Sequence, residues 1–135
     1  DANEPGAQPF IAITKPVGIQ DGDLLLAGIA IPGGSGVTIT PPDGWTLVLR
    51  ADELTNVGCA VYYKFAQSEQ ARWVWTPSTS DEFSAVLLVY AGVDGFTPID
   101  SQRGATTVAA GVHDIAGIAT ARNQEQIATF FAEKH

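Results

Sequence analysis

Carboxylates that stand close together are the first side chains in this sequence whose spacing could support chemistry. Asp21 and Asp23 flank one glycine, and Asp81 stands directly before Glu82. Glycoside hydrolysis needs two carboxyl groups that face each other across a cleft, which neighbours within a turn do not provide. The Asp-Gly-Asp turn could also give oxygen ligands to Ca²⁺, but it falls far short of an EF-hand loop. A solvated turn is therefore the favoured interpretation, and Asp21 and Asp23 are only weak candidates for a metal site.

Nucleophilic and zinc chemistry have few side chains to draw on. The sequence holds two histidines, His113 beside Asp114 and the terminal His135, and one cysteine, Cys59. No Gly-x-Ser-x-Gly elbow is present, and a zinc site needs more cysteines and histidines than these. Cys59 opens an apolar run, which favours a buried, unreactive thiol. We therefore predict no catalytic residue, no cofactor and no enzymatic activity.

Aromatic side chains are the stronger candidates for a binding role. Trp73 and Trp75 stand two residues apart in "ARWVWT", so they share one face of a strand. They could form a flat platform on which a sugar stacks, or they could fill a core, where large aromatics contribute most of the buried area. The core is favoured, because Val74 alone would contribute little to it from this strand. Tyr90 and Phe96 are further candidates for ligand or partner contacts.

The composition limits the class of protein to which this chain can belong. The chain has 135 residues, of which 45% are hydrophobic and 16% are charged, and its formal net charge is -8. This balance is typical of a globular chain, and the length suits a single domain over 1–135. A strongly acidic chain does not suit nucleic acid or an anionic membrane surface, because both attract basic patches.

Short runs of strand character separated by turn residues predict an all-β sandwich or barrel. The runs 24–31 and 83–93 are apolar on both faces, so we expect them to be inner strands. In the run 59–66, Val61, Tyr63 and Phe65 share one face, against Tyr62 and Lys64 on the other. The expected strands are 7–14, 24–31, 37–40, 45–51, 59–66, 71–76 and 83–93.

The turn before Trp45 predicts the place of that tryptophan. Prolines 41 and 42 cannot donate ladder hydrogen bonds and end one strand, and the Asp-Gly pair that follows makes a tight reversal. Trp45 then opens a new strand, in phase with Leu47 and Leu49. We expect the three side chains to share a face and Trp45 to be a plug at the edge of the core.

The last third of the sequence contains a weak internal repeat. The segment 127–132, "IATFFA", echoes 25–30, "LLAGIA", and "TARNQEQ" stands before it where "GIQDGD" stands before the first copy. This echo favours a core strand over the helix that Ala, Gln and Glu would also allow. A chain that stops directly after such a strand would be a truncated or partner-completed sandwich. We expect 1–8 to be a flexible N-terminal arm and 124–135 to be a last strand or a partner-contact tail.

Four blocks of the sequence together resemble a known family. They are "KPVGIQDGDLLLA", "TPPDGWT", "YYK" and "YAGVDGFTPID", and the similarity extends from Ile13 to Asp100, about two thirds of the chain. The blocks resemble a β-sandwich domain common in bacteriophage virion proteins and related bacterial surface proteins. The resemblance implies an antiparallel two-sheet β-sandwich of jelly-roll type. In that family a second "L-L-A" strand is often followed by another Pro-Pro-x-Gly turn, which this sequence lacks.

The same resemblance implies a non-enzymatic structural protein that acts by assembly or decoration. It would lie on the surface of a virion as a capsid decoration, head-fibre or tail protein, or on a bacterial cell surface. Its partners would be other virion proteins or copies of itself, and it carries over no catalytic residue. The alternative is a carbohydrate-binding or receptor-binding adhesive module, with a host-surface glycan as ligand. Burial of Trp73 and Trp75 would remove the main support for that alternative.

Overall fold

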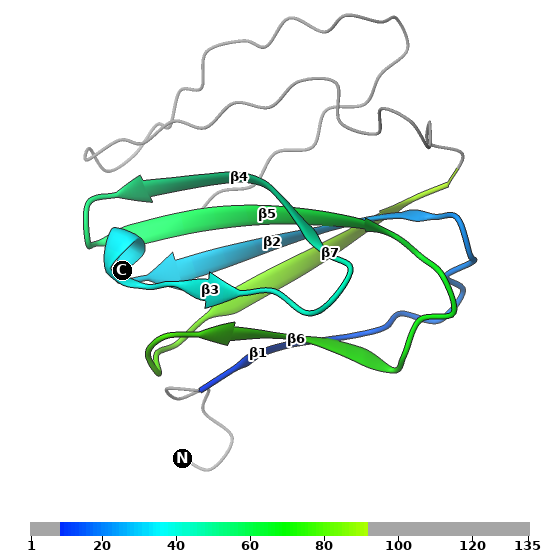
Figure 1. The fold of residues 1–135 in the computed structure, drawn as a ribbon, viewed down its shortest axis with the longest axis horizontal. Helices are drawn as coiled ribbons and strands as arrows, with labels where there is room; N and C mark the ends of the chain where they lie inside the picture. The colour runs from blue at the N-terminus through cyan, green and yellow to red at the C-terminus, as the bar shows by residue number, and fades with distance from the viewer. Residues whose placement is uncertain (1–8, 92–135) are drawn as a thin grey trace, which may run out of the picture.

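The computed structural model describes residues 9–91, which form an all-β fold with one short 3-10 turn (Figure 1). All seven expected strands are present, and the predicted ends that fall among the described residues lie within a few residues of the observed ones; residues 7 and 93 lie outside the described residues. They are β1 (Ile11–Thr14), β2 (Leu24–Pro32), β3 (Ile39–Thr40), β4 (Thr46–Glu53), β5 (Val57–Phe65), β6 (Arg72–Pro77) and β7 (Ser84–Tyr90), with η1 (Gly34–Gly36) between β2 and β3. The segments 1–8, 124–135 and 127–132, for which the sequence predicts an arm, a tail and a strand, lie outside the described residues.

The strands form two antiparallel sheets that pack face to face, which confirms the predicted sandwich. One sheet has the order β1-β6-β3 and the other β4-β5-β2-β7. The pairs β4–β5, β3–β6 and β2–β7 are nested one outside the other along the chain, and they alternate between the two sheets. A long hairpin folded over itself gives this nesting, so the sandwich is jelly-roll-like.

β2 is the central strand that its two apolar faces predict. It pairs along its whole length with β5 and over most of it with β7. β7 was also expected to be an inner strand, but within the described residues it pairs only with β2 and forms an edge of its sheet. A strand that is apolar on both faces need not be central in its sheet. One face can pack on the core while the other forms part of an apolar outer surface of the sheet.

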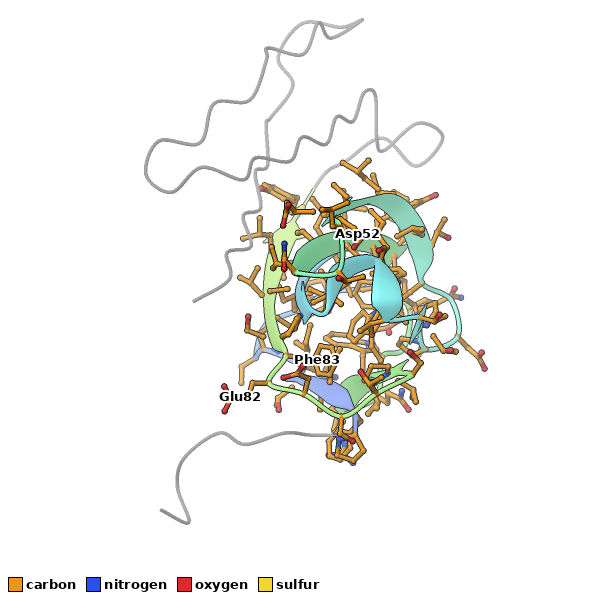
Figure 2. The ribbon with its side chains drawn as sticks, turned by 90° about the vertical axis from the view of Figure 1, so that its left-hand side faces the viewer. Asp52, Glu82 and Phe83 are labelled. Atoms are coloured by element: carbon orange, nitrogen blue, oxygen red, sulfur yellow. The ribbon has the colours of Figure 1, made fainter. Side chains whose placement is uncertain are left out.

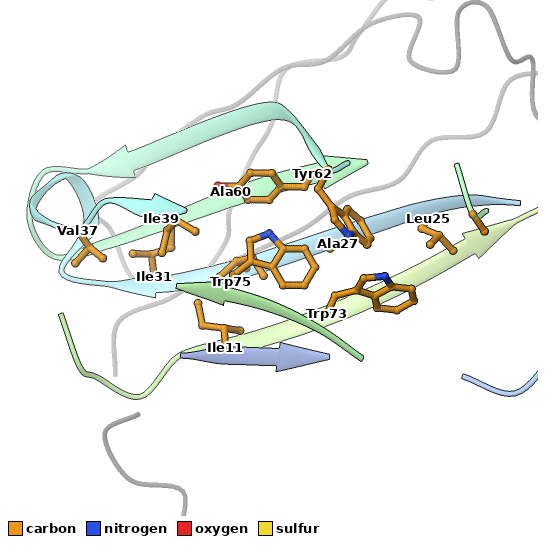
Figure 3. Packing of buried hydrophobic residues seen from close by; sticks show 13 residues of the cluster. Ile11, Leu25, Ala27, Ile31, Val37, Ile39, Ala60, Tyr62, Trp73 and Trp75 are labelled. Atoms are coloured by element: carbon orange, nitrogen blue, oxygen red, sulfur yellow. The ribbon is translucent and has the colours of Figure 1, made fainter. Parts of the chain in front are cut away.

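The core lies between the two sheets and is built from alternate strand positions (Figure 3). Leu25, Ala27, Ile29 and Ile31 point inward from β2, and each is 0% exposed. From β5 the inward positions are Ala60 and Tyr62. The bulkier face of β5, which contains Tyr63 and Phe65, therefore points away from the core.

Trp45 is buried, as the turn before it predicts, but Leu47 and Leu49 are not buried with it. Trp45 is 6% exposed, whereas Leu47 is 49% exposed. The expectation of one shared face is wrong at Leu49. Leu47 pairs with Tyr62, which points inward, so Leu47 lies on the core side of the sheet but is exposed in the edge strand β4. The pairing of β4 with β5 then shifts register between Leu47 and Leu49, which places Leu49 opposite Val61 on the side away from the core.

The turn η1 requires a glycine at position 34. Gly34 has φ +50°, and a Cβ there would collide with the backbone carbonyl of Leu54. We expect Gly34→Ala to lower the free energy of unfolding by about 2 kcal/mol, because it adds strain and forces two backbone segments apart. Urea denaturation measures this change. Gly36→Ala is the matched control, because its Cβ would meet only the Thr55 methyl group at 3.9 Å; equal losses in both variants would contradict the explanation.

Candidate functional site

The three tryptophans form one buried cluster and not a surface platform. Trp73 and Trp75 are 1% and 0% exposed. The ring centroids of Trp45 and Trp75 lie 4.9 Å apart, and those of Trp45 and Trp73 lie 5.5 Å apart, both in edge-on arrangements. The prediction that Trp73 and Trp75 fill the core is confirmed (Figure 3). In this structure neither side chain is accessible to a sugar or to a partner protein.

The indole N–H groups of these tryptophans have unequal surroundings. Trp73 Nε1 donates to Glu69 Oε1 at 2.8 Å, whereas Trp45 Nε1 and Trp75 Nε1 are buried without a hydrogen-bond partner. A buried donor without a partner costs about 1–3 kcal/mol. The hydrogen bond to Glu69 therefore fixes the orientation of only one ring, and ring-to-ring packing must hold the other two.

Glu69 is a buried acid that the sequence did not single out. Its side chain is 3% exposed, and Lys64 Nζ lies 3.0 Å from Oε1. Its Oε2 accepts from the Gln67 amide at 2.7 Å. The backbone carbonyl oxygen of Glu69 accepts from Lys15 Nζ at 3.1 Å. No spacing signal marks Glu69, which stands in the polar segment "QSEQ". This acid joins the β5–β6 turn to the β1 end of the sandwich.

The surroundings of Glu69 keep it ionised. Burial alone would raise its pKa, but hydrogen bonds from the Gln67 amide, the Trp73 indole and Lys64, with the Lys64 charge, outweigh burial. The pKa of Glu69 is therefore lower than usual. A general acid needs a raised pKa in order to hold a proton near neutral pH. Glu69 is an electrostatic anchor for the core and not a candidate catalytic acid.

The two candidate metal ligands are occupied with turn amides. Asp21 Oδ1 accepts from the Ser68 amide at 2.8 Å, and Asp23 Oδ2 accepts from the Gln20 amide at 2.9 Å. Among residues 9–91 no group of three or more His, Cys, Asp or Glu side chains could hold a metal ion. Asp23 therefore caps the backbone of its own turn, and Asp21 joins this turn to the β5–β6 turn.

The other acids of interest do not face each other. Asp81 Oδ1 accepts from the amide of the next residue, Glu82, at 2.7 Å, in the segment before β7. Asp52 is ion-paired with Arg50, whose Nε lies 3.1 Å from Oδ2. Figure 2 shows Asp52 and Glu82 well apart, with Phe83 beside Glu82 at the start of β7. The described carboxylates therefore do not form the facing pair that glycoside hydrolysis requires.

The surroundings of Arg50 and Cys59 indicate structural roles for both side chains. Arg50 Nη2 donates to the carbonyl oxygens of Gly34 at 2.7 Å and Val37 at 2.5 Å, so it ties η1 to β4. Cys59 is half-buried and not paired in a disulfide. Burial and the nearby Asp52 charge raise the pKa of its thiol. A raised pKa disfavours the reactive thiolate, as expected of an unreactive thiol.

The outer face of the four-stranded sheet is the most distinctive surface among the described residues. Leu24 and Leu26 on β2 alternate with the core positions, yet they are 3% and 7% exposed and lie outside the core cluster. Side chains of paired strand residues share a face, and the partners of these two leucines are aromatic or aliphatic. We define the outer face by Leu24, Leu26, Val61, Tyr63, Phe65, Val86, Leu88 and Tyr90.

Two details show how this outer face is built. The rings of Tyr63 and Phe65 meet edge to face, with centroids 6.5 Å apart. Val86 is 49% exposed, because its partner on the central strand is Gly28, which has no side chain to cover it. Tyr90, a predicted contact residue, lies half-buried on this face opposite Leu24. Phe96, the other predicted contact residue, and His113 lie outside the described residues.

The opposite surface of the sandwich is different in character. Outward positions of the three-stranded sheet are small or polar, and most of them are exposed; they are Ala12, Thr14, Thr40, Arg72, Val74 and Thr76. Only this sheet shows the usual alternation of an apolar core face and a solvated face. The two outer surfaces of the sandwich therefore differ, since that of the four-stranded sheet is apolar.

Comparison with known proteins does not add to this description. The chain matches no protein-family model, no curated protein and no solved structure. Within residues 9–91 no helix is long and apolar enough to cross a membrane.

Proposed function

We propose that this chain is a non-enzymatic structural protein of a bacteriophage virion, in which the β-sandwich docks on other subunits of the particle. The observation that carries the proposal is the apolar outer face of the four-stranded sheet. A sheet that covers a single core needs apolar side chains on one face only. Here the second face also carries the half-buried Tyr63, Phe65 and Leu88 beside the exposed Val86, and an apolar sheet face of this kind suits a protein interface.

The charge of the chain determines how such docking would work. With a net charge of -8, copies of the chain repel each other at long range. Apolar contact over the outer face would have to outweigh that repulsion, so association should strengthen when salt screens the charges. The virion location rests on the resemblance of the four sequence blocks, and copies of this chain are the first partner to test.

The adhesive alternative has lost its main support. A sugar platform depended on Trp73 and Trp75, and both side chains lie in the core. Of the remaining candidates, Tyr90 belongs to the outer face, which is an extended apolar surface and does not resemble an aromatic cleft. We therefore place assembly ahead of carbohydrate binding.

Val86→Lys is the variant that tests the docking surface. Val86 lies on the outer face and is half exposed, so lysine can be accommodated in the monomer but would bring a charge into the interface. We expect the dissociation constant for self-association to rise at least about tenfold. Sedimentation velocity over a concentration series, at low and moderate salt, measures it.

Thr76→Lys supplies the matched control, because Thr76 is exposed on the outward face of the other sheet. It adds the same charge, and we expect it to leave association nearly unchanged. A wild-type chain that stays monomeric at millimolar concentration would contradict docking between copies. Equal effects of the two lysines would show that net charge, and not the outer face, controls association.

A further inference from the structure

Two aspartate–glycine pairs lie in exposed turns of the described part of the chain. They are Asp21–Gly22, between β1 and β2, and Asp43–Gly44, between β3 and β4. In such a pair the backbone amide of the glycine can attack the carboxyl carbon of the aspartate, because glycine has no side chain that hinders the approach. The attack is intramolecular and closes a succinimide ring, so it depends on how freely the two groups can meet.

The reacting groups of Asp21–Gly22 are both held by hydrogen bonds. Asp21 Oδ1 accepts from the Ser68 amide at 2.8 Å. The Gly22 amide donates to the Ala66 carbonyl oxygen, also at 2.8 Å. Both groups are therefore tied to the chain that leaves β5, and both hydrogen bonds must open before the amide can reach the carboxyl carbon.

The reacting groups of Asp43–Gly44 are free of such hydrogen bonds. Among residues 9–91 neither the Asp43 carboxylate nor the Gly44 amide has a hydrogen-bond partner. The turn explains the free amide. The Trp45 amide donates to the Pro42 carbonyl oxygen at 3.3 Å, and Gly44 has φ +89°, as the third residue of a type II turn requires. The hydrogen bond of this turn uses the Trp45 amide and leaves that of Gly44 unpaired.

A positive charge also lies beside this second pair. A Cβ on Gly44 would lie 3.1 Å from Lys64 Nζ, whereas a Cβ on Gly22 would meet nothing within 4 Å. Glu69 Oε1 holds the Lys64 ammonium in place at 3.0 Å. Attack on the carboxyl carbon places negative charge on its oxygens, and a fixed cation nearby stabilises such charge.

We propose that Asp43 is a site of spontaneous isomerisation to isoaspartate. The Gly44 nitrogen bonds to Cγ of the protonated Asp43 side chain, the Cγ–OH bond breaks, and the hydroxyl leaves as water with the amide proton. Water then adds to the main-chain carbonyl carbon of the ring and breaks its bond to the Gly44 nitrogen. The chain now runs through Cγ, and the former main-chain carbonyl is a carboxyl group.

The consequence concerns the core, because isomerisation adds a methylene to the backbone directly before Trp45. It alters the turn whose hydrogen bond places this buried side chain. The proposal does not depend on the virion role.

Incubation of the full chain at mildly acidic pH and physiological temperature tests the proposal. Electron-transfer fragmentation in a mass spectrometer distinguishes isoaspartate from aspartate at each position. We expect isoaspartate to accumulate at position 43 at least about tenfold faster than at position 21, because two hydrogen bonds must open at the latter. The two sites lie in the same molecule, so each sample contains its own control.

The same incubation in concentrated urea separates the effect of the fold from that of the sequence. Unfolding removes the surroundings of both pairs, so their rates should become similar. Equal rates at the two positions in the folded chain, faster reaction at Asp21, or no isoaspartate at position 43 would each overturn the proposal. So would a difference that persists undiminished in urea, because it would belong to the neighbouring residues in sequence and not to the turn.

Discussion

Replacing Trp75 with alanine is expected to lower the free energy of unfolding by about 4 kcal/mol. Trp75 is 0% exposed and lies at the centre of the core, with its ring 4.9 Å from that of Trp45 and 6.0 Å from that of Tyr62. Truncation removes a large apolar surface and leaves a cavity that two rigid rings cannot close. Urea denaturation followed by near-UV and far-UV circular dichroism measures the change.

Val74→Ala is the control for Trp75→Ala, because Val74 is half-buried on the same strand but points outward. We expect it to lower the free energy of unfolding by less than about 1 kcal/mol. The comparison also separates a core residue from a ligand platform. A platform tryptophan would lose polysaccharide binding on truncation and leave stability unchanged. If Trp75→Ala unfolds at the same urea concentration as the wild type, the core assignment fails.

The strands of this sandwich could be predicted because they depend on local signals. The Pro-Pro-Asp-Gly turn and the two-residue alternation in "ARWVWT" are readable without a partner strand. The place of β7 in its sheet and the face of Leu49 could not be predicted this way. β7 pairs with β2, which is far from it in sequence, and the register shift that turns Leu49 outward leaves no mark in the local pattern.

The sequence also could not show which face of each strand points to the core. In β5 the alternation separates Tyr62 from Tyr63 and Phe65, but it does not say which set faces the core. The structure turns the larger set outward, because Ala60 and Tyr62 fit against the tryptophans of the opposite sheet. The sequence of β5 alternates like that of an ordinary core strand. The outer face, on which the proposed docking rests, could therefore not be predicted from it. Glu69 was hidden for a different reason, because its contacts with Lys64 and Trp73 form only when β5 and β6 fold on either side of the polar turn that contains it.

Replacing Glu69 with alanine is expected to lower the free energy of unfolding by about 3 kcal/mol. The change leaves the Trp73 indole and the Gln67 amide without their acceptor and removes the counter-charge of Lys64. Lys64 is partly exposed and can turn to water, whereas the Trp73 ring is fixed in the core. The indole is thus expected to account for much of the loss. Chemical denaturation at neutral pH measures it, and Glu82→Ala, which truncates an exposed acid, is the control.

The pH dependence of stability tests whether the charge of Glu69 matters. Its pKa in the folded chain is lower than the ordinary value of 4.5. The stabilisation from its ionised form is therefore complete above that value and is lost as pH falls through the folded pKa. We expect the wild type to lose its stability advantage over Glu69→Gln as the pH is lowered below 4.5. An advantage that stays constant down to pH 3 would show that hydrogen-bond geometry alone, and not the charge, anchors Glu69 to the core.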